Sequence, residues 1–175
     1  MVFFTSSMDQ IRLRALEPED ISTLFDVENQ VELWKYSNRN APFSKNMLKK
    51  YIEIQHQDIY ESKQQRFVVT DNGNIALGFI DLFDFEPFHL RAGVGLVILK
   101  EYQRQGLANK ALQILENHCT SFYKMHQLYA NIAVENKKSV ALFEKCGFKK
   151  AGHKKDWNFY EDAFHDEYIY QKILI

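Results

Sequence analysis

The chain has 175 residues, of which 46% are hydrophobic and 26% charged, with 22 basic and 23 acidic side chains. This length predicts one domain with its own hydrophobic core, and the near-zero net charge excludes general affinity for nucleic acid. The two cysteines, Cys119 and Cys146, are too few for a disulfide framework, and no apolar run approaches the roughly 20 residues that span a bilayer. We therefore expect a cytoplasmic protein with no metal site and no membrane partner.

The N-terminal part is expected to begin with a loose tail over residues 1–9. The alternation of apolar and basic residues over 11–14 predicts a short strand. Pro18, surrounded by acidic residues, predicts the first turn of a helix. Ser44 is the expected N-cap of a second helix, whose pattern fades near residue 60. The residues that follow the helical spacing are Met47, Leu48, Tyr51, Ile52 and Gln55.

Strands are expected in the middle of the chain. The Asn72-Gly73 pair predicts a hairpin between a strand over 66–70 and a longer strand that ends before Pro87. Residues 92–99 are apolar at successive positions, so both faces of that strand should be buried. This pattern is typical of a strand in the centre of a sheet.

The pattern becomes helical directly after Gly106 and returns to strand over 128–134, which predicts a strand-helix-strand crossover. A further helix is expected from Asn136, as N-cap, to Gly147. Two closing strands, 148–157 and 168–173, complete a mixed α/β sheet.

The loop between the central strand and the following helix is the segment most suited to chemistry. A helix N-terminus exposes N–H groups and carries partial positive charge, so a loop with Gly106 at that place is a candidate anion site. The loop matches neither the Walker pattern nor the dinucleotide fingerprint. A plain connecting turn is the alternative interpretation.

The segment Gln103-Arg104-Gln105-Gly106-Leu107-Ala108 resembles the Gln/Arg-x-x-Gly-x-Gly/Ala pyrophosphate loop of the GNAT N-acetyltransferase superfamily. The segment 136–148 is similar to the family's later Asn-x-x-Ser/Ala-x-x-Leu-Tyr-x-Lys-x-Gly-Phe motif. Within the family, residues 66–69 and 128–129 resemble the ribosomal-protein and spermidine acetyltransferase branch. The resemblance implies a GNAT-type domain over 10–175, with a central mixed sheet flanked by helices and a splayed pair of parallel strands.

The resemblance further implies acetyl-CoA as co-substrate and a primary amine as acceptor, on a protein N-terminus, a polyamine or another small amine. The amine would attack the thioester directly, and a homo-oligomer is compatible with the family. Main-chain N–H groups of the loop would hold the pyrophosphate, and the strand edge at 97–99 would pair with the pantetheine arm. The residues that the resemblance assigns to acetyl-CoA are Val97, Ile98, Leu99, Gln103, Arg104, Gln105, Gly106, Leu107, Ala108, Asn109, Asn136, Phe143 and Lys145.

Two positions depart from the family pattern. Phe143 stands where a tyrosine hydroxyl commonly protonates the departing thiolate, and Gly93 stands where the polyamine branch places a carboxylate near the amine. Asp81 and Asp84 are the candidate replacement bases. Alternatively, one of them binds a cationic substrate or pairs with Arg91.

These departures bear on the acceptor. Exposing the neutral form of a lysine-like amine at pH 7.4 costs about 4 kcal/mol, against under about 1 kcal/mol for an α-amine, so an α-amine acceptor is favoured. The stretch 36–45 carries two cations and no carboxylate, which argues against a polyamine at that place. Four large aromatic residues are candidates either for an acceptor pocket or for the core: Trp34, Tyr36, Tyr51 and Trp157.

Two other classes of function stay open on the sequence. A degenerate family member could bind acyl-CoA without turnover, in agreement with Phe143 and Gly93. The other alternative is an α/β interaction domain without a co-substrate.

Overall fold

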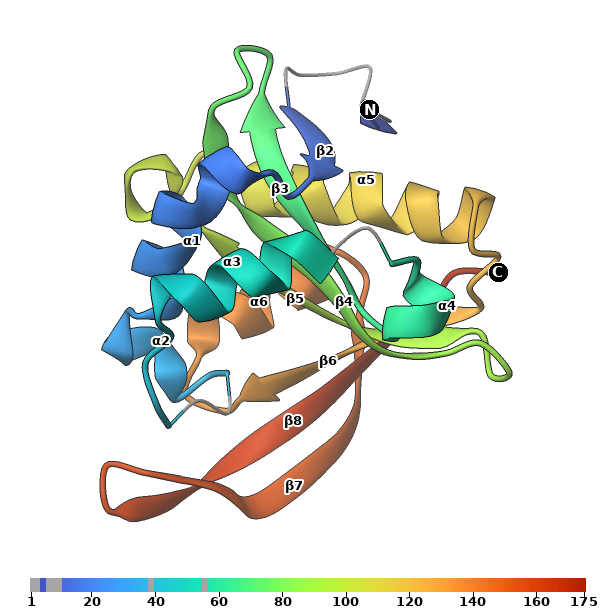
Figure 1. Cartoon of the computed structure of the whole chain (residues 1–175). Coiled ribbons are helices and arrows are strands. Elements are labelled where there is room, and N and C mark those ends of the chain that lie inside the picture. The colour runs from blue at the N-terminus through green and yellow to red at the C-terminus, as the bar shows by residue number, and fades with distance from the viewer. Residues whose placement is uncertain (1–3, 6–10, 38–39, 55–56) are drawn as a thin grey trace.

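A computed structural model describes residues 4–5, 11–37, 40–54 and 57–175. The strands form one eight-stranded sheet in the order β1-β2-β3-β4-β5-β6-β8-β7 (Figure 1). Their bounds are β1 Phe4–Thr5, β2 Ile11–Ala15, β3 Gln65–Asp71, β4 Ala76–Glu86, β5 Arg91–Ile98, β6 Gln127–Ala133, β7 Lys149–Tyr160 and β8 Ala163–Ile173.

The helices cover both faces of the sheet. None of them, over the ranges described, is long and apolar enough to cross a membrane. The α-helices are α1 Ile21–Glu28, α2 Val31–Trp34, α3 Lys45–Glu53, α4 Ile59–Ser62, α5 Leu107–Ser121 and α6 Lys137–Lys145, and the 3-10 turns are η1 Pro18–Asp20 and η3 Lys100–Tyr102.

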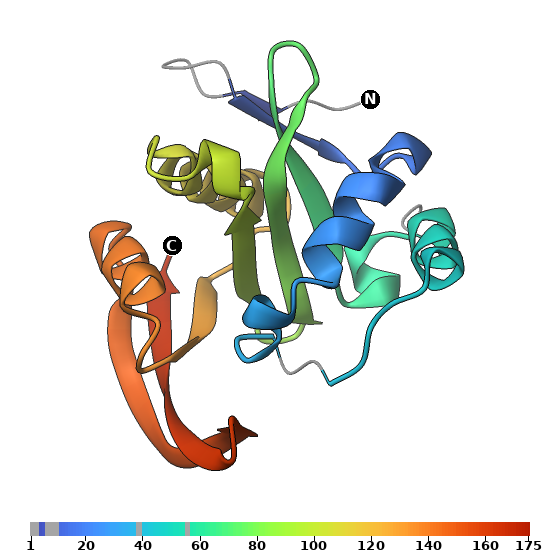
Figure 2. The same cartoon turned by 90° about the vertical axis from the view of Figure 1, so that its left-hand side faces the viewer.

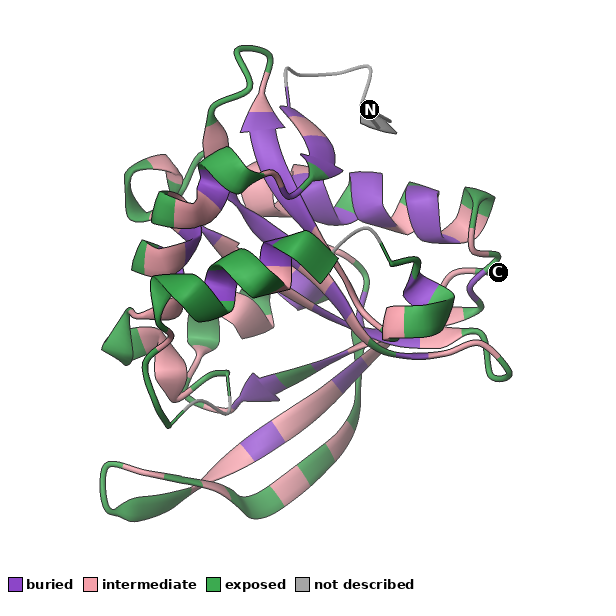
Figure 3. Cartoon of the chain, viewed as in Figure 1, coloured by how far each residue is buried: buried purple, intermediate pink, exposed green. Residues whose placement is uncertain are grey.

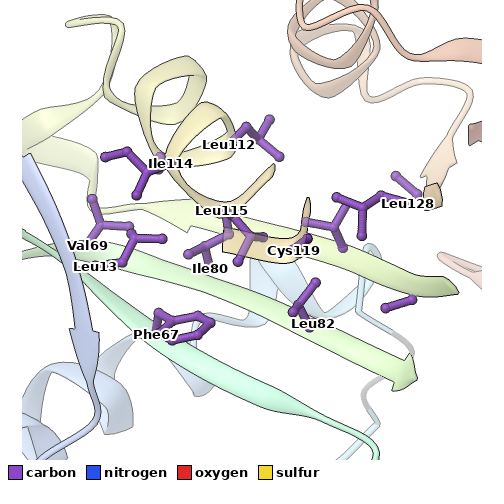
Figure 4. Packing of buried hydrophobic residues seen from close by; sticks show 14 of the residues in the cluster. Leu13, Phe67, Val69, Ile80, Leu82, Leu112, Ile114, Leu115, Cys119 and Leu128 are labelled. Carbon is purple, nitrogen blue, oxygen red and sulfur yellow. The ribbon is translucent and has the colours of Figure 1, made fainter. Parts of the chain in front are cut away.

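The core has two layers, one on each side of the sheet. On one side α5 packs its apolar stripe against the sheet, so that Leu115 lies next to Ile80 of β4 (Figure 4). On the other side α1 and α3 pack on Val68 and Phe79. Because side chains alternate along a strand, successive residues of β4 face these two layers in turn.

β5 and β6 run parallel in the centre of the sheet, whereas the other neighbouring strands are antiparallel. Their pairing ends at Gly93↔Tyr129, although β5 continues to Ile98 and β6 to Ala133. Beyond this pair the two strands separate, and β6 leaves with β8 and β7 (Figure 2). The predicted mixed α/β sheet with a splayed parallel pair is confirmed.

Several predicted elements are confirmed, and some bounds differ. The Ser44 hydroxyl accepts a hydrogen bond from the N–H of Met47, as an N-cap does. The helix it begins ends at Glu53 instead of fading near residue 60, and a separate turn, α4, begins at its own cap, Asp58. Gln55, assigned to the second helix by its spacing, lies outside the described residues.

Other differences lie at the ends of the chain. Residues 4–5, inside the predicted tail, pair antiparallel with β2. The closing strands are longer than predicted, because the turn between them is confined to Glu161 and Asp162, both at positive φ. No periodic pattern in the sequence predicts the four-residue α2.

Candidate active site

The gap between β5 and β6 is the opening in the sheet around which the candidate site is built. The N–H of Leu99 donates to the carbonyl of Leu77 at 2.9 Å, so main-chain groups at odd-numbered positions of this edge face β4. Alternation then directs the main-chain groups of Val94, Leu96 and Ile98 into the gap. An extended ligand arm could pair there as a third strand would.

This register corrects part of the sequence prediction. The prediction assigned Val97, Ile98 and Leu99 to main-chain pairing with the ligand. In the structure Val97 and Leu99 direct their main-chain groups to β4. Ile98 faces the gap, and its carbonyl accepts a hydrogen bond from the Gln103 side chain at 2.9 Å.

The loop that closes the wide end of the gap has the geometry of an anion site. Arg104 and Gly106 have φ values of 64° and 76°, and Gly106 is the N-cap of the 15-residue helix α5. A Cβ built on Gly106 meets no atom within 4 Å, so there is open space beside this residue at the start of α5. A helix start with orphan N–H groups and room beside it fits a pyrophosphate. Arg104, Gln105, Leu107, Ala108 and Asn109 are the neighbouring loop and first-turn residues.

The second motif forms α6, on the α5 side of the sheet. The Asn136 side chain accepts a hydrogen bond from the N–H of Ser139 at 3.2 Å, so it caps the helix. Among the described residues its amide N–H groups have no hydrogen-bond acceptor. Phe143 is 5% exposed and meets Phe148 edge-on at 4.9 Å, so its ring belongs to the core instead of an open surface. Lys145 is exposed at the end of α6.

Asp81 lies on the α1 and α3 side of the sheet in an ion pair. Its two oxygens accept hydrogen bonds from the Arg66 guanidinium at 2.5 and 2.8 Å, and Arg66 also pairs with Glu28. Burial opposes the charge of Arg66, but the carboxylates outweigh it and raise its pKa. Asp81 therefore pairs with Arg66 and not with Arg91, and both of its oxygens are engaged.

Gly93 is not an empty position but one that a neighbouring ring occupies. A Cβ on Gly93 would lie 2.2 Å from the Phe83 ring, far inside van der Waals contact. Phe83 and Gly93 are directly opposed in the antiparallel pair of β4 and β5, so their side chains share one face. The ring of Phe83 thus excludes a carboxylate from position 93.

Asp84 follows Phe83 at an irregularity in β4, with φ at 48°. Its carboxylate accepts a hydrogen bond from the Tyr129 hydroxyl at 3.4 Å. Burial, and next the charge of Asp84, raise the pKa of Tyr129, which keeps this hydroxyl protonated as a donor. The sequence prediction named Asp84 but missed Tyr129 and Phe83, because only the strand register brings the three together.

A cleft of about 580 Å³ lies between α2 and the tip of the β7-β8 hairpin. It contains two carboxylates, Glu32 and Glu161, and Lys35 pairs with Glu161 at 3.2 Å. Of the four candidate pocket aromatics, Trp34 and Trp157 line this cleft, whereas the Arg66 guanidinium lies over the Tyr51 ring. The lining residues are Val31, Glu32, Trp34, Lys35, Asn40, Trp157, Asn158, Phe159, Tyr160 and Glu161.

A splayed parallel pair with a candidate anion site at its wide end is the arrangement that the resemblance to the GNAT acetyltransferases implies. The model of the GNAT acetyltransferase domain matches residues 10–149, most of the chain, and the chain therefore belongs to this family. It is an N-acetyltransferase that transfers an acetyl group to an amine.

Relatives of the chain are named for different substrates. It is 28% identical over 157 residues to a spermidine N(1)-acetyltransferase of Vibrio cholerae, with 90% of this chain and 89% of the relative covered. It is 23% identical over 172 residues to a ribosomal-protein-serine acetyltransferase of Escherichia coli, with 95% and 94% covered.

Solved structures agree with this assignment. The spermidine N-acetyltransferase of Vibrio cholerae in complex with CoA and spermine has a TM-score of 0.86 and 26% identity, over 94% of this chain and 96% of that one. A dodecameric structure of the Vibrio cholerae enzyme in an intermediate state has a TM-score of 0.77 at 26% identity, with 94% of each chain covered.

The Phe83 ring fills the space that a side chain at position 93 would need, and this packing can be tested by measuring the stability of variants. Gly93→Ala is expected to lower the free energy of unfolding by about 1–3 kcal/mol, because the new methyl overpacks against the ring. In a Phe83→Ala background the same change should cost much less. Urea denaturation of the two single variants and the double variant measures this coupling.

Gly95→Ala is the matched control, because its Cβ would lie 3.8 Å from the same ring, an ordinary contact. It should cost less than Gly93→Ala and show no dependence on Phe83. An equal loss of unfolding free energy for Gly93→Ala in the wild-type and Phe83→Ala chains would contradict this packing between the ring and position 93.

Proposed function

We propose that this chain transfers the acetyl group of acetyl-CoA to the primary amine of a small cationic molecule. The observation that supports the donor is the gap beyond Gly93 and Tyr129, which ends at the open helix start beside Gly106. Loop N–H groups would hold the pyrophosphate, the main-chain groups of Val94 and Leu96 would orient the pantetheine arm, and Asn136 would contact it from α6.

In this mechanism acetyl-CoA supplies the thioester carbonyl that the amine attacks, without a covalent intermediate on the protein. The residues around the gap act mainly by alignment, which can contribute on the order of 7 to 11 kcal/mol to catalysis. A thiol has a reference pKa near 8.5, so a thiolate can depart without a protonated partner. The hydroxyl that Phe143 lacks is therefore less important than a group that takes the proton from the amine.

The cleft beside α2 supports a cationic acceptor. Because Lys35 is paired with Glu161, the carboxylate of Glu32 gives the cleft a net negative charge, and the Trp34 ring offers a cation–π face. The Trp157 ring already has the Lys154 ammonium over it, 4.6 Å from its centroid. This proposal departs from the α-amine expectation, because the acidic groups come from outside the stretch 36–45. N-terminal peptides are the competing acceptors, and a module that binds acyl-CoA without turnover is the competing function.

Self-association is a further part of the proposal. Trp157, Phe159 and Phe164 near the tip of the β7-β8 hairpin are 59–63% exposed, an apolar surface of the kind that partners cover (Figure 3). The dodecameric relative supports a second copy of this chain as the partner. We also place the reaction in the cytoplasm, in agreement with two free cysteines.

Light scattering on the purified chain tests the assembly. We expect a mass of several subunits, and Phe164→Glu should lower it because a charge would be buried at the contact. A wild-type chain that is monomeric at micromolar concentration would contradict the assembly and leave the reaction itself unaffected.

Binding of acetyl-CoA is tested by thermal unfolding. At about 100 times its Kd the ligand should add about 2.7 kcal/mol to stability and raise Tm by about 5–10 °C. Gly106→Ala should abolish most of this rise, because its methyl would project into the open space beside the loop that is proposed to hold the pyrophosphate.

Gly147→Ala is the matched control, since Gly147 also has a positive φ, 87°, at a helix end. It should lose stability from the same backbone strain and keep the ligand-induced rise. The absence of a rise in the wild-type chain would overturn acetyl-CoA binding.

The acceptor is tested by thiol release with spermidine, butylamine and N-terminal peptides. Glu32→Gln should raise KM about fivefold for spermidine and leave KM for butylamine within about twofold, because the lost charge faces the second cation. The exposed Glu19→Gln is the control and should change neither value. A much higher kcat/KM for N-terminal peptides than for spermidine would overturn the cationic small-molecule acceptor, and no release with any amine would favour the module without turnover.

A further inference from the structure

The narrow end of the gap holds a carboxylate beside the last paired residues of β5 and β6. Tyr129, which closes the parallel pairing with Gly93, donates its hydroxyl to Asp84 Oδ2 at 3.4 Å. The Tyr129 ring meets the Phe83 ring edge-on, with centroids 6.0 Å apart. Because an arm that pairs along the gap must stop where the gap closes, these side chains border the reacting end of the ligand.

The backbone of β4 is irregular at Asp84, and this irregularity places the Asp84 side chain beside Tyr129. The register with β5 shifts between Phe83 and Glu86, and Asp84 takes a φ of 48° inside this irregularity. Irregularities of this kind re-aim a side chain, and a left-handed backbone at a residue other than glycine carries a cost. As a result the Asp84 side chain is exposed beside Tyr129 and is not paired across the sheet.

The other carboxylates of β4 are paired with cations. No ion pair involves Asp84 among the residues that the structure describes. Asp81 pairs with Arg66 at 2.5 Å, and Glu86 pairs with Arg91 at 2.8 Å. Asp84 is thus the acid in this group whose second oxygen is open to a substrate ammonium.

Resting on the proposed function, we infer that Asp84 is the catalytic base that takes the proton from the acceptor amine, and that Tyr129 positions its carboxylate. The bound ammonium gives one proton to Asp84, and the neutral nitrogen then forms a bond to the thioester carbon. The carbon–sulfur bond breaks and its electron pair stays on sulfur, while the second proton of the nitrogen passes through water to the thiolate. The base therefore comes from β4 instead of β5, where the Phe83 ring excludes it.

Asp84→Asn tests the inference by thiol release from acetyl-CoA with butylamine. Asparagine tolerates a positive φ, so the fold should persist. At pH 7 kcat/KM should fall about 100-fold, within the range of general base catalysis. Between pH 7 and 9 the variant's kcat/KM should rise about tenfold per pH unit with the neutral fraction of the amine, and the wild-type value should rise less steeply, so the loss shrinks.

Asp156→Asn is the matched control, because Asp156 is also exposed and has a φ of 49°. It should keep the wild-type rate and pH profile. Tyr129→Phe should lower kcat by about three- to tenfold and keep the wild-type slope with pH, as expected for a positioning residue.

The outcomes separate this inference from the function on which it rests. A wild-type chain that turns over, together with an Asp84→Asn variant within about twofold of it and with the same pH profile, overturns the inference alone. A wild-type chain that binds acetyl-CoA and releases no thiol overturns both. An Asp84→Asn variant with lost turnover, retained acetyl-CoA binding by thermal shift and the steeper pH slope supports both.

Discussion

The separation of β5 from β6 after Gly93 and Tyr129 is the constraint on which the rest of the molecule depends. A parallel pair that parts in the middle of a sheet leaves main-chain groups of β5 without strand partners, and buried groups of this kind require compensation. β6 can leave because β8 pairs with it along its whole length, from Gln127 to Ala133. The long β7-β8 hairpin is therefore what allows the gap to exist, and its tip also forms one wall of the cleft beside α2.

Because the Phe83 ring fills the space beside Gly93, it determines which positions can place a polar side chain at the end of the gap. With the ring over β5, no side chain can project from position 93, and the polar groups of that face come from the neighbouring strands. Two acidic residues of β4, three positions apart, illustrate the difference that geometry makes. Asp81, in the regular ladder, is neutralised by Arg66, whereas Asp84, in the irregular part, meets a tyrosine hydroxyl.

Most of the fold could be predicted from the sequence because its signals are local. Ser44, Asn136 and Gly147 mark helix ends by their own side-chain or backbone chemistry, and the two motifs indicated the family and the splayed pair. The candidate site was harder because it depends on register. The order of residues alone does not show that the main-chain groups of Val97 face β4 and those of Leu96 face the gap. Nor does it show that the Phe83 ring fills the space beside Gly93. The short α2 and the carboxylates of the cleft gave no periodic pattern at all.

Phe143 and Gly93 looked alike as losses of catalytic groups, yet their consequences differ. A thiolate is a better leaving group than an alkylamide anion by many powers of ten, so the tetrahedral adduct collapses toward the amide once the nitrogen has lost its proton. The step that needs help is therefore the removal of that proton. Replacing a hydroxyl at position 143 by hydrogen lets the ring pack edge-on against Phe148 without a buried polar atom to satisfy. The absence of a hydroxyl at position 143 thus improves packing of the core and slows the departure of the thiolate little. The absence of a carboxylate at position 93, by contrast, requires a base from another position, and the irregular backbone of β4 supplies Asp84.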